Sequence, residues 1–164
     1  MHHAVLSPNR RMVVAGLSLL ASPAPAKAKP CPPPRVLFVC PAGTVKSAIA
    51  REYLKRTAAK QGVAVQVQSR GVHPEDHVSP ELAVRLRAEG IDPAAEPLRS
   101  LAPADITGAD IVIAFDEAAQ APGMSAARSW SIPSWNSDFE RAKAALLVQI
   151  EALLGELRDR GCAT

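Results

Sequence analysis

Residues 36–52 read VLFVCPAGTVKSAIARE, and this stretch contains the pattern that decides the fold. Val36–Val39 form a continuous apolar run, which is typical of a strand buried on both faces. Cys40 ends the run, and a helical spacing of apolar residues begins at Ser47. The stretch therefore predicts a buried strand, a short loop and a helix.

Strand and helix patterns alternate along the rest of the chain. Ser79–Pro80 is a typical helix start, and Gly90 is a typical helix end. We expect strands at 36–39, 63–68, 98–101 and 111–115, and helices at 47–59, 79–90, 105–108 and 139–161. This order predicts a single three-layer α/β domain with a doubly wound parallel sheet. Cys40 then lies at the carboxyl end of a strand, where such folds bind ligands.

The loop after Cys40 has the features of an anion-binding site. Backbone N–H groups at a helix start, together with the helix dipole, attract anions. Gly43 permits a left-handed backbone, Lys46 adds a positive charge at the rim, and the Ser47 hydroxyl could donate to a thiolate. We therefore predict a phosphate-binding loop with Cys40 as the nucleophile. The alternative is a packed cysteine that precedes an ordinary turn.

This stretch resembles the N-terminal signature of the low-molecular-weight protein tyrosine phosphatases, V-L-F-V-C-x-G-N-x-x-R-S-x-x-A-E. That family also includes the thioredoxin-coupled arsenate reductases. The likeness continues through SRGVHPEDHVSPELAVRLRAEGID, ADIVIAFD and SDFERAKAALLVQIEALL, so it covers residues 34–160. The resemblance implies the phosphatase fold, with the phosphate-binding loop after the first strand.

The resemblance also implies the chemistry of the site. Cys40 would form a covalent phosphocysteine, with Lys46 in the place of the arginine that grips the phosphate and Ser47 beside it. Backbone N–H groups from Ala42 to Ser47 would surround the phosphate oxygens. The remaining residues of the expected loop are Pro41, Ala42, Gly43, Thr44 and Val45. Neither a metal nor an organic cofactor is expected, and the substrate would be a phosphorylated protein or a small aryl phosphate.

Two departures from the family pattern lie within the loop. Lysine is a point charge on a flexible stem, whereas arginine is a planar fork that holds two phosphate oxygens. Losing one charge-assisted hydrogen bond costs about 1.5–3 kcal/mol. Ala42 and Gly43 stand where the family has its Gly-Asn pair. We therefore expect anion binding with weakened control of the transition state.

A third departure concerns the general acid, which in the family is the Asp of an Asp-Pro pair before the last helix. Here that stretch reads SWSIPSWNSDFE, and no carboxylate lies between Glu117 and Asp138. Aligning the proline loops puts Ser134 nearest the place of the acid. Asp138 is interpreted as the cap of the last helix, and Asp116 or Glu117 as a possible substitute acid. Trp130 and Trp135 flank the loop and wall the pocket or pack in the core.

Other polar residues have plainer interpretations. His73, Asp76 and His77 read as a polar turn before Ser79, although they follow the second strand and could border the pocket. The only Asp-Pro pair, Asp92–Pro93, reads as a turn in another loop.

The three cysteines are Cys31, Cys40 and Cys162. They contain no C-x-x-C and have no neighbouring histidine ligands, so zinc is unsupported. No cysteine lies between Cys40 and Cys162, and Val45 fills the second-cysteine place of the phosphatase loop. An intramolecular thiol relay is therefore not expected, whereas an arsenate reductase that uses an external thiol stays open.

Residues 1–28 have the pattern of a signal peptide and also resemble a twin-arginine export signal, and residues 29–34 read as a Pro-rich linker. We expect the domain at 35–161 and a periplasmic or exported protein, or a cytoplasmic one if translation starts further downstream. The formal net charge of +3 falls to zero without the three basic residues of 1–28. With aromatic content of 4%, this balance disfavours nucleic-acid binding. The apolar part of the leader is too short to span a membrane.

Three functions remain open from the sequence. The first is a cysteine-dependent hydrolase of phosphotyrosine-type monoesters with impaired activity. The second is a non-catalytic binder of oxyanions or phosphoproteins, and the third is the arsenate reductase that uses an external thiol.

Overall fold

The computed structural model describes residues 32–160. The expected leader at 1–28, the first part of the expected linker, Cys31 and Cys162 lie outside the described residues.

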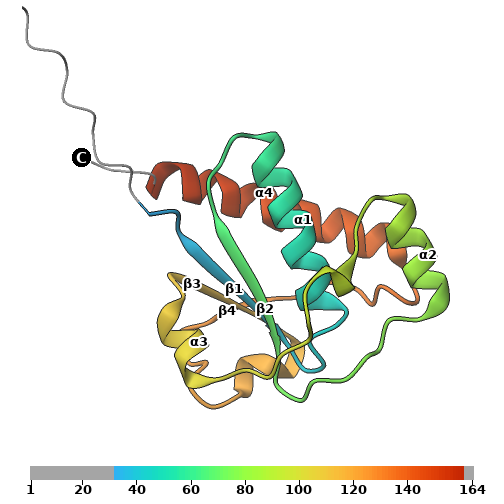
Figure 1. The fold of residues 1–164 in the computed structure, drawn as a ribbon, viewed down its shortest axis with the longest axis horizontal. Coiled ribbons are helices and arrows are strands. Elements are labelled where there is room, and N and C mark those ends of the chain that lie inside the picture. Colours follow the sequence, from blue (N-terminus) through green and yellow to red (C-terminus); the bar gives the residue numbers. More distant parts are fainter. Residues whose placement is uncertain (1–31, 161–164) are drawn as a thin grey trace, which may run out of the picture. The chain divides into compact units, whose positions relative to one another are not determined.

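Four parallel strands form the sheet, in the order β2-β1-β3-β4 (Figure 1). They are β1 (Arg35–Cys40), β2 (Gln66–Gly71), β3 (Ile111–Phe115) and β4 (Arg128–Trp130). From β1 the chain runs to β2 on one side and later to β3 and β4 on the other side. The topological switch point therefore lies between β1 and β3, which confirms the doubly wound sheet.

Helices cover both faces of the sheet. On one face Val36, Phe38 and Cys40 pack in one core cluster with the buried residues of the helices α1 (Lys46–Lys60) and α4 (Phe139–Arg160). On the other face Leu37 and Val39 pack with residues of the helix α3 (Pro103–Gly108) and of the 3-10 helix η2 (Asp116–Gln120). Alternate residues of one buried strand thus enter two separate cores, as the continuous apolar run predicted.

The expected helix signals are also confirmed. The helix α2 (Pro80–Ala88) begins after Ser79, whose hydroxyl accepts a hydrogen bond from the N–H of Leu82 at 3.2 Å. Gly90 follows this helix with a φ of +70°. The turn at Asp92 is the start of the 3-10 helix η1 (Pro93–Ala95), and the Asp92 carboxylate accepts from the N–H of Ala94. Local capping chemistry therefore explains these boundaries.

Three strand predictions need correction. The second strand is β2 at 66–71 instead of 63–68, because a turn at Gly62 follows α1 and ladder pairing begins only at Arg35↔Gln66. Residues 98–101 form no strand, and only Ser100 makes an isolated bridge to Gly71. The three-residue strand β4 had no expected counterpart, because a strand so short has no readable periodicity. Within residues 32–160, no helix is both long and apolar enough to cross a membrane.

Candidate active site

Cys40 lies at the carboxyl end of β1, beside the start of α1. Its side chain is buried, with 3% of the residue exposed. The N–H of Gly43 donates a hydrogen bond to Cys40 Sγ at 3.1 Å, and Ser47 Oγ lies 3.1 Å from the same sulfur. The sulfur thus faces one backbone donor and one hydroxyl, both of which stabilise a thiolate.

The Ser47 hydroxyl has a second partner. Its Oγ also lies 3.4 Å from the carbonyl oxygen of Arg70, to which it can donate. A hydroxyl has a single proton, so Ser47 can donate either to the Arg70 carbonyl or to Cys40 Sγ, and in the first case it can accept from a thiol. This arrangement lets one side chain accommodate both charge states of the cysteine.

The start of α1 supplies further donors. The first N–H groups of a helix have no partner within the helix, and here the residue before α1, Val45, has no side chain that could cap them. The N–H groups of Lys46 and Ser47 are therefore available to an anion held above the sulfur. The 15-residue helix adds its dipole to this attraction.

Two glycines let the loop pack closely against β2. Gly43 has a φ of +81°, and a Cβ there would lie 2.7 Å from the backbone nitrogen of Gly71. A Cβ at Gly71 would lie 2.8 Å from the carbonyl oxygen of Ala42. Neither position accepts a side chain without a backbone shift, so both glycines are part of the loop geometry.

The segment after β2 holds the outer side of the loop. The N–H groups of Val72, His73 and Glu75 donate to the carbonyls of Cys40, Pro41 and Ala42, at 3.2, 2.8 and 3.0 Å. Because these loop carbonyls are paired on the outside, the loop keeps its shape without a bound anion. The segment 72–77, which contains the expected polar turn, is therefore part of the scaffold of the loop.

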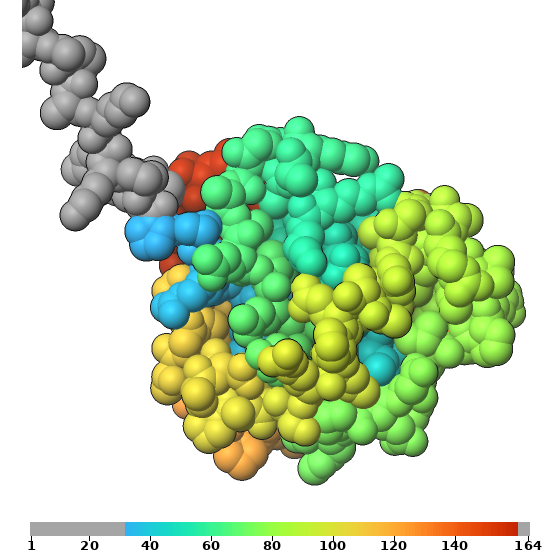
Figure 2. Space-filling view, in the orientation of Figure 1, coloured from blue at the N-terminus to red at the C-terminus, as the bar shows by residue number. Residues whose placement is uncertain are grey.

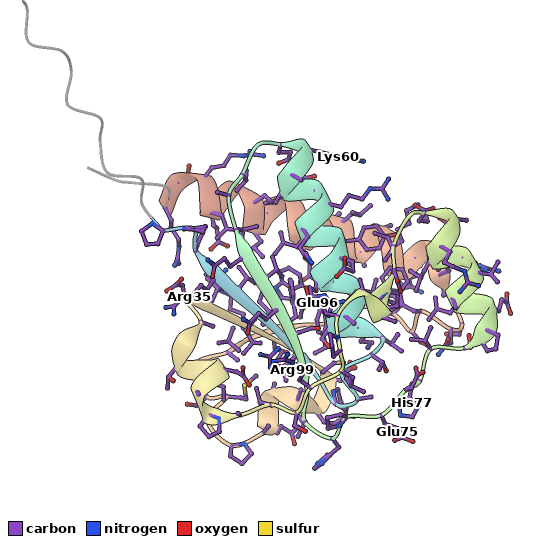
Figure 3. All side chains as sticks on the ribbon, in the orientation of Figure 1. Arg35, Lys60, Glu75, His77, Glu96 and Arg99 are labelled. Atoms are coloured by element: carbon purple, nitrogen blue, oxygen red, sulfur yellow. The ribbon has the colours of Figure 1, made fainter. Side chains whose placement is uncertain are left out.

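Thr44 completes this attachment. Its Oγ1 donates to the carbonyl of Glu75 at 2.8 Å and accepts from the N–H of His77 at 3.1 Å. The side chains of Glu75 and His77 lie together at the outer surface, 3.1 Å apart (Figure 3). His73 and His77 thus border the loop through their backbone N–H groups, whereas the Asp76 carboxylate accepts from the N–H of Val78. All three residues are exposed.

Lys46 does not extend freely into solvent at the rim. Its Nζ donates to Asp116 Oδ1 at 2.7 Å and to the carbonyl oxygen of Ile132 at 3.1 Å, and 18% of its side chain is exposed. Asp116 follows β3 directly and has a φ of +54°, an uncommon value for a residue other than glycine. The structure therefore brings together Lys46 and one of the candidate acids.

The loop before α4 places its residues differently. Ser134 is exposed, and its carbonyl accepts from the N–H of Asp138. Asp138 Oδ1 accepts from the N–H of Arg141 at 3.3 Å, so Asp138 caps α4 as interpreted. The residue of this loop that contacts Lys46 is Ile132, which precedes Pro133.

The two tryptophans pack in the interior. Trp135 is 2% exposed, and its ring lies 6.0 Å from that of Tyr53 and 5.4 Å from that of Phe139. Trp130 is partly buried and lies 5.6 Å from the ring of Phe38. Both therefore serve the core, which was one of the two interpretations.

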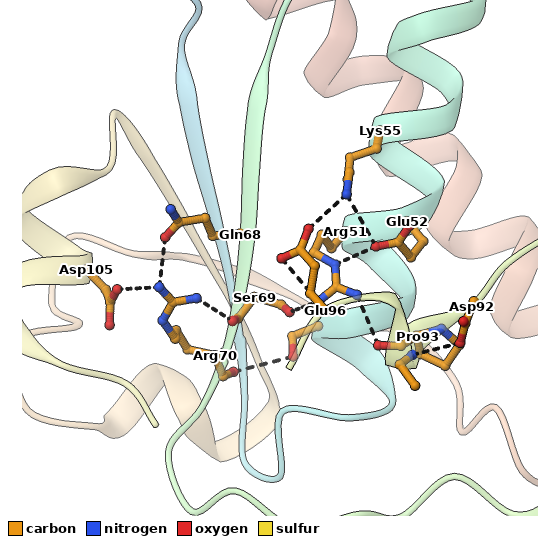
Figure 4. A network of polar contacts seen from close by, with 12 residues as sticks. Arg51, Glu52, Lys55, Gln68, Ser69, Arg70, Asp92, Pro93, Glu96 and Asp105 are labelled. Atoms are coloured by element: carbon orange, nitrogen blue, oxygen red, sulfur yellow. Dashed lines mark hydrogen bonds and ion pairs between the residues drawn. The ribbon is translucent and has the colours of Figure 1, made fainter. Parts of the chain in front are cut away.

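Arg51 is a buried residue whose role the sequence did not suggest. It lies one helical turn after Ser47 and is 2% exposed. Its guanidinium donates to Glu52, to Ser69 Oγ on β2 and to the carbonyl of Pro93, at 2.6, 2.8 and 3.0 Å (Figure 4). These bonds tie α1 to β2 and η1 behind the loop. The spacing of four residues from Ser47, on the inner face of α1, was the available signal.

The backbone carbonyl of Arg70 faces Ser47, and its side chain is bound by a residue of α3. Its guanidinium donates to Asp105 Oδ1 at 2.7 Å, and both side chains are largely buried (Figure 4). Burial raises the pKa of Asp105, but hydrogen bonds from Arg70 and from the N–H of Ala102 outweigh it and hold that pKa below its ordinary value. The carbonyl that faces Ser47 therefore belongs to an anchored residue.

A cavity of about 400 Å³ lies behind the loop. Gly43 and Thr44 form one wall, and Val78, Ile91 and Leu98 line other parts of it. Figure 2 shows this side, where cyan atoms lie in a recess between the green and yellow segments. Within the described part of the chain, no group of three or more His, Cys, Asp or Glu side chains is placed to hold a metal ion.

The described residues form a doubly wound α/β domain with a buried cysteine in the loop between β1 and α1, at the switch point of the sheet. The family described as low molecular weight phosphotyrosine protein phosphatase matches residues 35–146. The chain belongs to this family, and it is a phosphatase-like enzyme.

Solved structures share the fold. YfkJ from Bacillus subtilis has 21% sequence identity and a TM-score of 0.64, with 84% of this chain and 100% of that chain covered. The low molecular weight protein tyrosine phosphatase from T. tengcongensis has 24% identity and a TM-score of 0.56, with coverage of 77% and 99%. The thioredoxin-dependent arsenate reductase Cg_ArsC1' from Corynebacterium glutamicum has 23% identity and a TM-score of 0.60, with coverage of 77% and 63%. No curated protein sequence matches the chain.

Proposed function

We propose that the protein hydrolyses phosphate monoesters of the phosphotyrosine or aryl type, with Cys40 as nucleophile. The observation that carries this proposal is the position of Cys40 Sγ, which accepts from Gly43 and lies 3.1 Å from Ser47 Oγ beside the start of α1. An anion above the sulfur would meet the free N–H groups of the helix start. Membership of the phosphatase family supports the same chemistry.

In the first step the Cys40 thiolate attacks phosphorus, the S–P bond forms, and the bond from phosphorus to the aryl oxygen breaks. In the second step water attacks the phosphocysteine, the S–P bond breaks, and phosphate and the thiolate are released. Backbone N–H groups at the start of α1 stabilise the charge on the phosphoryl oxygens in both steps.

We expect slow turnover. Lysine replaces the planar arginine grip, and the loop that contains Ser134 supplies no carboxylic acid. General acid catalysis contributes typically about 10²–10⁴-fold, so the second difference is the larger one.

A chromogenic aryl phosphate assay of the wild type and the Cys40→Ser variant tests this proposal. We expect hydrolysis by the wild type and none above background by Cys40→Ser. Equal rates for the two proteins would show that Cys40 is not the nucleophile.

An arsenate reductase that uses an external thiol is the second candidate function. It is favoured by the structural likeness to the reductase from Corynebacterium glutamicum. Arsenate would bind in the same loop, and its reduction to arsenite would oxidise Cys40 and the external thiol to a mixed disulfide. Arsenate-dependent consumption of thioredoxin or a small thiol, lost in Cys40→Ser, separates this function from hydrolysis.

The third candidate function is non-catalytic binding of an oxyanion or a phosphoprotein. It is favoured by Lys46 in the place of the arginine and by the lack of a carboxylate between Glu117 and Asp138. Phosphate or sulfate would then raise the melting temperature without turnover, and the rise would depend on Lys46. The absence of a shift with any oxyanion would exclude this function.

We also propose that the protein is exported. The support is the pattern of residues 1–28, with two arginines before a short apolar stretch and an A-x-A site. Mass spectrometry of the N-terminus of the protein from cell fractions tests this, and an intact Met1 start in the cytoplasm would contradict it.

A further inference from the structure

An aryl phosphate needs a proton for its leaving oxygen. The one carboxylate of the loop before α4, that of Asp138, is engaged in capping the helix. The residue before Pro133 is Ile132, whose side chain is apolar and whose exposed fraction is 5%. Any donor must therefore come from another element that reaches this loop.

Lys46 is a charged side chain that does so. Its Nζ lies 3.1 Å from the carbonyl oxygen of Ile132 while its backbone belongs to the first turn of α1. The ammonium thus lies between the phosphate-binding loop and the loop where the family carries its acid. An ammonium has three N–H donors, and two have partners here, Asp116 and Ile132. One N–H is left for the substrate.

We propose that the Lys46 ammonium is the proton donor to the leaving oxygen and that Asp116 is the residue that positions it. This inference rests on the proposed hydrolase function. It changes the role of Lys46 from a substitute for the phosphate-gripping arginine to that of the general acid.

The chemistry of lysine suits this role for a phenolic leaving group. Free lysine and tyrosine side chains titrate at about 10.4 and about 10, so a proton passes between them almost without a free-energy difference. Arginine, which titrates above about 12, holds its proton too tightly to donate it. Lysine in place of arginine therefore loses the planar grip but gains a transferable proton.

The protons and electrons balance over the cycle. As the bond from phosphorus to the aryl oxygen breaks, that oxygen keeps the electron pair and takes one proton from Lys46 Nζ, which becomes a neutral amine. When water attacks the phosphocysteine, the amine takes the proton that the water loses. The sulfur leaves with the S–P electron pair as a thiolate, and the ammonium is restored.

Asp116 itself is a poor donor in this arrangement. Its Oδ1 accepts the hydrogen bond from Lys46 Nζ at 2.7 Å, so this oxygen is engaged as an acceptor. Its position at the end of β3, next to β1 in the sheet, directs the carboxylate toward Lys46. Asp116 thus acts as the positioning residue, because its hydrogen bond fixes where the ammonium lies.

The test compares the wild type, Lys46→Arg and Asp116→Asn on a series of aryl phosphates from phenyl to dinitrophenyl phosphate. Dinitrophenolate leaves without a proton, whereas phenolate needs one. We expect Lys46→Arg to lose about 100-fold or more in kcat on phenyl phosphate and little on dinitrophenyl phosphate. Asp116→Asn should show a smaller loss with the same dependence on the leaving group.

Lys143→Arg is the matched control. Lys143 also forms an ion pair, with Glu89 at 2.6 Å, and its side chain is 24% exposed. This variant should follow the wild type on every ester. Inorganic phosphate should inhibit Lys46→Arg at least as well as the wild type, because arginine holds two oxygens. Such inhibition shows that the variant is folded and that its loop binds anions.

Two outcomes would overturn the inference and are distinguishable. A Lys46→Arg variant that is faster or slower by the same factor on all esters would show that Lys46 grips the anion and donates no proton. The proposed hydrolase function would then stand. Failure of the wild type to hydrolyse any ester above Cys40→Ser would reject the hydrolase function and the inference together.

Discussion

Lys46 Nζ and Asp116 Oδ1 lie 2.7 Å apart, although 70 positions separate the two residues along the chain. The contact arises because β1 and β3 are neighbours in the sheet and end at the same edge. Lys46 at the start of α1 and Asp116 directly after β3 therefore meet at the switch point of the sheet. One ion pair thus joins the start of α1 to the segment that follows β3.

The close approach of β2 to the loop predicts a large effect of Gly71→Ala. The new Cβ would lie 2.8 Å from the Ala42 carbonyl oxygen, so the loop or the strand must shift. We expect the free energy of unfolding to fall by about 1–3 kcal/mol and phosphate affinity to fall with it. Chemical denaturation and phosphate inhibition measure the two effects.

Gly155→Ala is the control for this substitution. Gly155 lies inside α4, and a Cβ there would meet nothing within 4 Å. This variant should be more stable than the wild type by about 0.5–1 kcal/mol, with unchanged phosphate affinity. Similar losses in both variants would contradict the steric explanation.

Because the Arg51 guanidinium is buried and hydrogen-bonded, we expect its removal to lower the stability of the fold. Arg51→Met would leave Ser69 Oγ and the Pro93 carbonyl without their donor. We expect a loss of about 3–5 kcal/mol in the free energy of unfolding. Arg128→Met, which breaks a half-exposed pair with Glu156, should cost less than about 1 kcal/mol. Equal costs in a denaturant titration would argue against the network.

We expect Tyr53 to lose its proton at a higher pH than an ordinary tyrosine. Burial, and then the charge of Glu89, raise the pKa of Tyr53 to about 12 from an ordinary value of 10.0. It is the only tyrosine of the chain, so phenolate absorbance reports on this residue alone. The neutral phenol therefore contributes stability that is complete below pH 10 and is lost as the pH rises toward about 12. A midpoint near 10 in the folded protein would contradict this prediction.

The contribution of Asp105 to stability is expected to be lost at acid pH. Because its pKa in the folded protein is depressed, its contribution is present above the ordinary carboxyl pKa and is lost as the pH falls through the depressed value. We expect Asp105→Asn to be less stable than the wild type at neutral pH and to lose less stability on acidification. Thermal melts from neutral pH to below pH 4 compare the two proteins, and parallel curves would reject the assignment.

The succession of elements was largely readable from local patterns. The apolar run 36–39, the Ser79–Pro80 helix start and the long stripe of the last helix each reflect burial or capping within a few neighbouring residues. The boundary of β2 was missed because pairing with Arg35, and not the alternation of VAVQVQ, determines where the strand begins. Strand β4 was missed because its three residues gain their structure only from β3.

The features of the site also fall into two groups, those that local patterns predict and those that depend on the fold. Neighbouring residues are enough to predict that Cys40 ends a buried strand and that a glycine and a serine follow at the spacing of a loop and a helix start. They also show that no carboxylate lies between Glu117 and Asp138. The contacts of Lys46 with Asp116 and with the carbonyl of Ile132, which is 86 positions away, exist only in the folded chain. Sheet order and parallel crossovers determine such contacts, and no local pattern contains them.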